Sequence, residues 1–157
     1  FAVLVAISAF QTVTLQESAM EPTYSVSEKF FVNRALYKVS SPKRGDVIVF
    51  KTSASDSAAL HIRRVIGLPG ETVQVKDGKI YINGKVYEEN GAYQDMTDGG
   101  LANSAITLES GEYFVLGDNR NNSEDSRFSD IGNISKKYIV GKVWFTVSPK
   151  NKIGFIK

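Results

Sequence analysis

The chain has no cysteine and a single histidine among its 157 residues. The absence of thiols excludes disulfides, thiolate zinc sites and a cysteine nucleophile, and one histidine leaves too few ligands for a structural metal site. The phosphate-binding patterns G-x-x-x-x-G-K-[ST] and G-x-G-x-x-G are missing as well. We therefore expect neither a metal nor a cofactor.

An excess of one charge sign is missing too, because 19 Lys and Arg side chains balance 17 Asp and Glu side chains to a net charge of +2. This balance argues against nucleic acid as a partner. The one long apolar run covers residues 1–10, FAVLVAISAF, and is shorter than the roughly 20 residues that cross a bilayer. We expect it to be the end of a truncated transmembrane anchor; a buried first strand or helix is the alternative.

The remaining composition, with 42% hydrophobic and 23% charged residues, is that of a globular domain. Alternating or β-branched segments predict strands, and Asp77-Gly78 and Asn83-Gly84 predict hairpin turns between them. No segment shows a helical period over more than two turns, and a short helix is expected only at 135–138. The fold class is therefore mostly antiparallel β, a barrel or sandwich. The expected strands are 11–17, 44–50, 60–67, 68–75, the hairpin segments within 75–87, 111–117 and 138–149, with a loop over 90–104.

Two adjacent arginines interrupt the apolar strand 60–67. Strand alternation places Arg63 on one face together with His61, and Arg64 on the other. A charge on a buried face must be paired. The partners of the right kind are Asp118, Asp125 and Asp46. Asp118 and Asp125 belong to the densest polar stretch, 117–127, which by itself is typical of a solvated loop tied by Asx turns.

Four blocks of this sequence, taken in order, resemble the type I signal peptidases of bacteria, with a Gram-positive-like pattern. The family blocks are S-M-x-P-T, R-G-D-[IV]-[IV]-x-F, K-R-V-I-G-x-P-G-[DE] and G-D-N-R-x-x-S-x-D-S-R. The chain reads AMEPT at 19–23, RGDVIVF at 44–50, RRVIGLPGE at 63–71 and GDNRNNSEDSR at 117–127. The last block meets every fixed position.

The resemblance implies a membrane-tethered serine endopeptidase that removes signal peptides at the outer face of the membrane, after a small-x-small site. It implies a twisted, mostly antiparallel β fold with a small β cap. We expect the anchor end at 1–10, a catalytic-type core at 11–72 and 112–157, and the cap at 73–111. The expected location is the cell membrane, with a single-pass anchor and an extracellular soluble domain. The expected partners are the membrane and an exported preprotein or a pilin-like polypeptide.

The family's Ser–Lys dyad falls on Ala19 (nucleophile position) and Arg63 (general-base position). Alanine has no nucleophilic oxygen. A lysine base works because burial lowers its pKa, whereas arginine keeps its proton in proteins. Loss of such a dyad costs on the order of 10⁶ in rate, judged from serine proteases. We predict that the chain as written does not cut signal peptides.

The resemblance also gives roles to residues around these two positions. Ser123 matches the serine that hydrogen-bonds the dyad lysine, and we expect it to meet the Arg63 guanidinium. Glu17 stands where some members place a second oxyanion donor, which a carboxylate cannot be. Met20 matches a packing residue. A supporting polar network matches Arg64, Asp118, Asp125 and Arg127.

Three interpretations remain open. In the first, the chain is a natural non-catalytic member, an assembly or chaperone-like factor that acts on pili and holds a polypeptide by strand addition near Thr12–Ala19 and Leu60–Arg63. In the second, it is a signal peptidase I inactivated by engineering. In the third, Ser18 and His61 form a relocated dyad. That pair needs a kink, because on an extended strand Ser18 points away from the face of Ala19.

Overall fold

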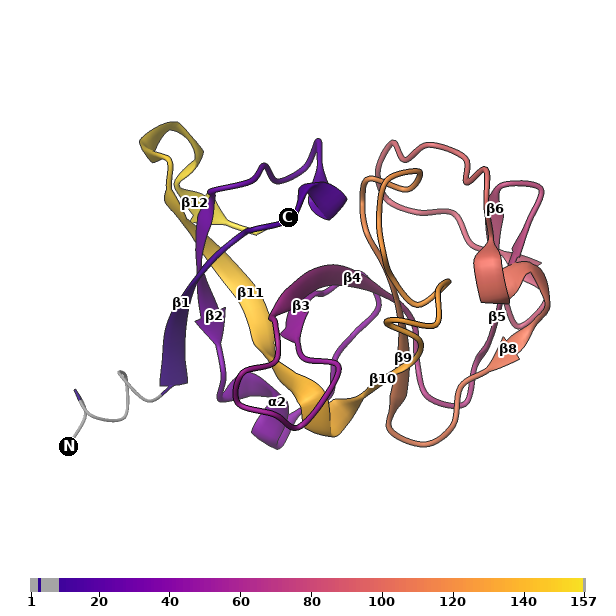
Figure 1. Cartoon of the computed structure of the whole chain (residues 1–157), viewed down its shortest axis with the longest axis horizontal. Helices are drawn as coiled ribbons and strands as arrows, with labels where there is room; N and C mark the ends of the chain where they lie inside the picture. Colours follow the sequence, from indigo (N-terminus) through magenta and orange to yellow (C-terminus); the bar gives the residue numbers. More distant parts are fainter. Residues whose placement is uncertain (1–2, 4–8, 157) are drawn as a thin grey trace.

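Two antiparallel sheets make up the protein in the computed structural model, which describes Val3 and residues 9–156 (Figure 1). The larger sheet has the strand order β1-β2-β11-β3-β4-β9-β10, with β12 paired to β11. Its strands are β1 (Phe10–Thr14), β2 (Lys29–Asn33), β3 (Val47–Phe50), β4 (His61–Gly67), β9 (Glu112–Leu116), β10 (Ile134–Ser135), β11 (Ile139–Ser148) and β12 (Gly154–Phe155).

The smaller sheet has the order β7-β6-β5-β8 and is drawn at the other end of the molecule from β1 (Figure 1). It consists of β5 (Thr72–Lys76), β6 (Lys79–Ile82), β7 (Lys85–Val86) and β8 (Ile106–Thr107). Its two tight turns are those that the sequence predicts. Asp77 and Gly78 have φ values of 51° and 76°, and Asn83 and Gly84 have 51° and 79°. Positive φ at both central residues is the type I′ geometry that suits hairpins.

From Phe10 onward, the helical structure of the described residues consists of short turns. The α-helix described over its full length is α2 (Leu36–Val39), and the 3₁₀ turns are η1 (Ser18–Met20), η2 (Gly100–Asn103), η3 (Lys136–Tyr138) and η4 (Lys150–Lys152). The mostly β fold class is therefore confirmed, and so is a short helix at the end of 135–138. The sequence did not predict β2 and α2, and η2 lies within the segment expected to be a loop.

The strand expected over 11–17 is partly wrong. β1 ends at Thr14, and after Glu17 the chain turns into η1. Apolar side chains on both sides of this turn are buried in one cluster, so Leu15 and Met20 pack with Ile62 of β4. The turn is therefore seated on the core by packing, and Ala19 is held inside it with 4% of its surface exposed. The strand expected over 68–75 begins only at Thr72.

The anchor expected over 1–10 lies mostly outside the described residues. Within the described part of the chain, no helix is long and apolar enough to cross a membrane. The expected division into a core and a cap at 73–111 stays a prediction; the strands of the smaller sheet occupy Thr72 to Thr107.

The segment 117–127 packs tightly on η1 at Gly117, which lies against the carbonyl group of Ala19. A Cβ on Gly117 would lie 2.5 Å from the carbonyl oxygen of Ala19 and 2.1 Å from the hydroxyl of Ser123. Next to it, the Asn119 backbone N–H donates to the Ala19 carbonyl at 2.9 Å. Only glycine allows the two segments to approach this closely.

We predict that Gly117→Ala destabilises the protein by roughly 2–4 kcal/mol, because the added methyl group pushes η1 away from 117–127. Gly132→Ala is the control: nothing lies within 4 Å of its Cβ, and its φ of 63° costs about 1 kcal/mol. Urea unfolding measures both. Equal losses for the two variants would contradict the close approach at Gly117.

Candidate functional site

Ala19 sits at the centre of η1, with its backbone tied to 117–127. The Asn119 side-chain amide donates to the Ser18 carbonyl at 3.1 Å, beside the backbone bond to Ala19. The Glu21 N–H closes the turn on the Ser18 carbonyl. Residue 19 is thus held in a fixed position, but its side chain is a methyl group. It carries no atom that attacks a carbonyl or moves a proton.

Arg63 of β4 contacts the residue just before η1 and the segment 117–127, and its side chain is 1% exposed. Its guanidinium donates to the Glu17 carboxylate at 2.6 Å, to the Glu124 carbonyl at 2.8 Å and to the Ile62 carbonyl at 2.7 Å. A buried cation is tolerated only when it is paired and its N–H groups have acceptors. These three partners hold the guanidinium in place.

Glu17 is the acid that balances this cation, and it lies directly before η1. Its carboxylate also contacts His61 Nδ1 at 3.0 Å, so it bridges two residues on one face of β4. Partial burial alone would raise the pKa of the Glu17 carboxyl. The hydrogen bonds from His61 and Arg63 outweigh that effect and lower the pKa to about 2. Glu17 is therefore a carboxylate at neutral pH, with Nδ1–H of His61 as its second donor.

The relocated Ser18–His61 pair is not formed in the structure, because no hydrogen bond joins the two side chains, both of which are described. Ser18 lies in η1 and not on an extended strand, so the expectation that it alternates with Ala19 is wrong. His61 Nδ1 donates to Glu17, and its ring lies 5.6 Å from that of Phe50. The expectation that His61 and Arg63 share a face is confirmed, because both contact Glu17.

Arg64 points to the opposite face of β4. It makes a two-pronged ion pair with Asp118 at 2.9 and 2.7 Å, as the sequence predicts, and donates to the Gly45 carbonyl at 3.0 Å. Burial alone would lower the pKa of the Arg64 guanidinium, but the hydrogen bonds to Asp118 raise it above its usual value. Arg64 therefore stays charged and is a structural cation.

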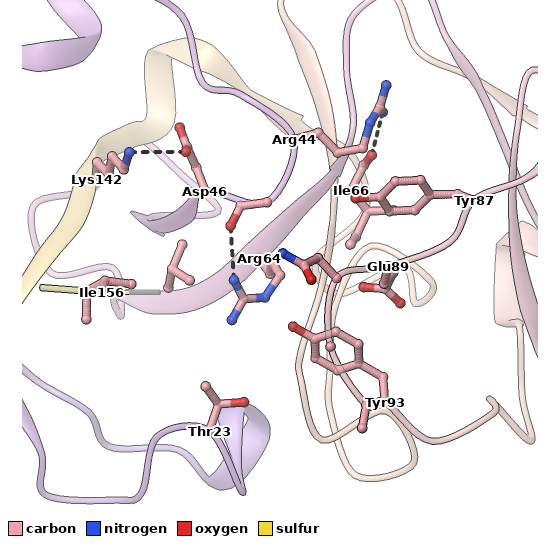
Figure 2. A pocket seen from close by; sticks show the side chains of 15 residues that line it. Thr23, Arg44, Asp46, Arg64, Ile66, Tyr87, Glu89, Tyr93, Lys142 and Ile156 are labelled. Carbon is pink, nitrogen blue, oxygen red and sulfur yellow. Dashed lines mark hydrogen bonds and ion pairs between the residues drawn. The ribbon is translucent and has the colours of Figure 1, made fainter. Parts of the chain in front are cut away.

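Arg64 also lines a pocket of about 630 Å³ between β4 and the segment 87–93 (Figure 2). The charged side chains drawn there are already paired. Arg44 binds Glu71 at 2.6 Å, and Lys142 lies 3.2 Å from Asp46. Neither Ala19 nor Arg63 belongs to its lining. The pocket is therefore separate from the Ala19–Arg63 site.

The other predicted partners are assigned differently. Asp125, fully buried, accepts from Arg127 at 2.8 and 2.9 Å and from the Gly117 N–H. Ser123 donates to Asp125 at 3.0 Å. The expected contact of Ser123 with the Arg63 guanidinium is wrong, because Asp125 takes the hydroxyl and Glu124 supplies a carbonyl to Arg63. Asp46 pairs with Lys142 and accepts from the Tyr37 hydroxyl.

The residues singled out by the sequence thus fall into two connected groups. Ala19 and Met20 lie in η1, and Arg63 binds Glu17 directly before that turn. The polar network of 117–127 forms the second group and holds η1 through Asn119. The pairing of Glu17 with Arg63 is not among the predictions from the sequence. The available signal was a buried arginine that needs an acid, together with a glutamate two residues before Ala19. Among the described residues, no group of three His, Asp or Glu side chains gathers to hold a metal ion.

Comparisons with known proteins show the family to which the chain belongs. The family model described as "Signal peptidase, peptidase S26" matches residues 1–148. The chain belongs to the signal peptidase S26 family. It is 35% identical to signal peptidase I T of Bacillus subtilis over an alignment of 159 residues. This alignment covers 97% of this chain and 81% of that protein. It is 32% identical over 151 residues to probable signal peptidase I-2 of Synechocystis, and spans 65% of that protein's length and 90% of its own.

A solved structure of a signal peptidase I from Enterococcus faecalis agrees with the fold. The two structures superpose with a TM-score of 0.51 and a sequence identity of 32%. The match covers 67% of this chain and 98% of the other. Membership of the S26 family and the mostly β fold therefore rest on independent comparisons.

We predict that Glu17→Gln destabilises the protein by about 1–3 kcal/mol at neutral pH. A buried pair that loses one partner costs about 3–5 kcal/mol, reduced here because the Glu17 side chain is 35% exposed. Glu17→Gln combined with Arg63→Met is expected to recover most of this loss, because no unpaired cation remains. Urea unfolding of the two variants and of Arg63→Met completes the cycle.

Glu124→Gln is the matched control for this cycle. It removes the same charge from an exposed side chain and leaves intact the carbonyl that Arg63 uses. Its stability is expected to equal that of the parent. A Glu17→Gln variant as stable as this control would contradict the pairing of Glu17 with Arg63.

Proposed function

We propose that this member of the signal peptidase family does not cleave, and that it binds an exported polypeptide near a small-x-small site. The observation that carries the proposal is the pairing of Arg63 with Glu17 beside Ala19. By the family blocks, Arg63 stands at the position of the general base and Ala19 at the position of the nucleophile. A methyl group at one and a paired guanidinium at the other leave neither an attacking oxygen nor a group that accepts its proton.

The contacts of Arg63 favour a natural member over an engineered knockout. A single change to alanine at position 19 explains a disabled enzyme without any other difference. Here Arg63 also differs from the family pattern, and Glu17 supplies the carboxylate that this buried cation requires. Two residues that compensate each other's charge indicate a site adapted to its present composition.

Two strand edges near this site support polypeptide binding. β1 is the terminal strand of the larger sheet. β4 pairs with β9 only from Arg64 onward, so that among the described residues His61–Arg63 lack a partner strand on that side. Glu17 connects the edge of β1 with the unpaired edge of β4, because it follows β1 in the chain and its carboxylate contacts His61 and Arg63 of β4. An extended peptide gains affinity from main-chain hydrogen bonds to such edges.

The polypeptide is an exported preprotein or a pilin-like protein, and the protein acts in its assembly. In this proposal the domain stands outside the cell and is tethered to the membrane through the apolar run at residues 1–10. Binding without cutting suits an assembly or chaperone-like factor, because the bound segment leaves unchanged.

Calorimetry with a peptide that carries an Ala-x-Ala site tests the binding. We expect binding in the micromolar range, equivalent to about −8 kcal/mol. The matched control is the same peptide with alternate backbone amides N-methylated, which keeps the side chains and removes main-chain donors. It is expected to lose at least about tenfold in affinity. Equal affinity for both peptides, or no binding of either, would overturn the proposal.

Restoring activity requires three changes rather than two. A lysine introduced by Arg63→Lys would face the Glu17 carboxylate, which raises the lysine's pKa and keeps it protonated. We predict that Ala19→Ser/Arg63→Lys stays nearly silent at neutral pH and gains activity as pH rises. Adding Glu17→Ser is expected to shift this profile to lower pH, with about a tenfold gain in rate at neutral pH for each unit of pKa lowered.

Cleavage of a model preprotein across a pH series distinguishes these variants. Glu124→Gln added to the double variant is the control, since it removes a nearby charge that Arg63 does not use. Identical pH profiles with and without Glu17→Ser would show that Glu17 does not govern the base position.

A further inference from the structure

A strongly basic groove lies at one end of the larger sheet. It has a volume of about 880 Å³ and is lined by Arg34 and α2, by η3 and the start of β11, and by the segment after β3. Five of its lining side chains are cations and none is an acid. These cations are Arg34, Lys38, Lys51, Lys136 and Lys137.

None of the five takes part in an ion pair among the described residues, although nine such pairs occur elsewhere. Lys136 donates only to neutral groups, the Ser40 carbonyl at 3.2 Å and the Ser41 hydroxyl at 3.3 Å. Lys137 lies 5.0 Å from the Tyr138 ring. In a chain with a net charge of +2, five uncompensated cations in one groove form a concentrated anion-binding surface.

The groove lies at the end of the sheet where the apolar run at residues 1–10 joins the domain. The backbone N–H of Arg34 donates to the carbonyl of Ala9 at 2.7 Å. In Figure 1, α2 lies on the same side of the molecule as the N-terminal end of β1. Directly beside Lys38, Val39 is 89% exposed and is the most exposed large hydrophobic side chain among the described residues.

We propose that this groove binds the phosphate headgroups of an anionic lipid surface. Lysine and arginine bind phosphate as charge-assisted donors, and basic residues next to a membrane are attracted to anionic lipids. An exposed apolar side chain next to such residues inserts at the boundary between headgroups and acyl chains. This inference goes beyond the proposed polypeptide binding. It rests on the proposed membrane tether only for the claim that the groove faces the lipid surface.

Val39 is the reason to favour a lipid surface over a soluble polyanion. A free polyphosphate or an acidic peptide gains affinity from the five cations but little from one exposed valine. An extended lipid surface gains from both, because it offers phosphate groups to the groove and an apolar interior to Val39 beside it. The contribution of Val39 therefore separates the two sources of phosphate.

Vesicle co-sedimentation of the whole chain tests the inference. The vesicles are phosphatidylcholine alone or a mixture with phosphatidylglycerol, so that any binding by residues 1–10 appears with both. We expect tighter binding to the mixed vesicles. Lys38→Gln/Lys137→Gln is expected to lose roughly 25-fold on them, from about fivefold for each basic residue.

Lys76→Gln/Lys85→Gln is the matched control. These two lysines are exposed, unpaired in the described structure and carried by the smaller sheet, so the variant has the same net charge. An equal loss in this control would show that overall charge, and not the groove, drives binding. No preference for the mixed vesicles would overturn the inference outright.

Val39→Ser completes the test. Weaker vesicle binding by this variant, with unchanged binding of soluble polyphosphate, supports a lipid surface. Unchanged vesicle binding would overturn the lipid assignment in favour of a free polyanion. Affinity for the Ala-x-Ala peptide, measured on the same variants, is expected to stay constant, so a failure of the groove is distinct from a failure of the proposed function.

Discussion

The ion pair between Arg63 and Glu17 is the constraint on which the candidate site depends. A guanidinium with 1% of its side chain exposed cannot stay unpaired, because its desolvation costs several kcal/mol. Glu17 satisfies it from the entrance of η1, and Glu124 adds a carbonyl from 117–127. One side chain of β4 thus joins the residue before η1 to the segment 117–127, and the positive charge of Arg63 requires the carboxylate of Glu17 near Ala19.

The rest of the site follows from how these segments are held together. Gly117 allows η1 and 117–127 to touch, Asn119 ties the carbonyls of the turn, and Asp125 gathers the donors of its own loop. The polar groups of this framework are hydrogen-bonded to one another, although the framework surrounds a position without a nucleophile. Such an arrangement keeps a binding surface in shape, which accords with a protein that holds a polypeptide and releases it uncut.

Sequence reasoning succeeded where local rules are strong. The Asp-Gly and Asn-Gly turns, the alternation of β4 and the Arg64–Asp118 pair follow from backbone sterics or from the need to pair a buried charge. It failed at β2, where Phe31 is exposed and hides the alternation around Phe30. It also failed at Glu17, because QTVTLQE alternates like a strand to its end. Only tertiary packing of Leu15 and Met20 shows that a turn intervenes.

The chain belongs to the S26 family, and we propose that it keeps the framework of the site without cleaving. The most direct test is prolonged incubation of the unaltered chain with a preprotein that carries an Ala-x-Ala site, read by mass spectrometry. The account predicts intact preprotein at all times and at every pH where the chain is folded. A product cut after the small residue, formed by this chain and lost in Ser18→Ala, would contradict it.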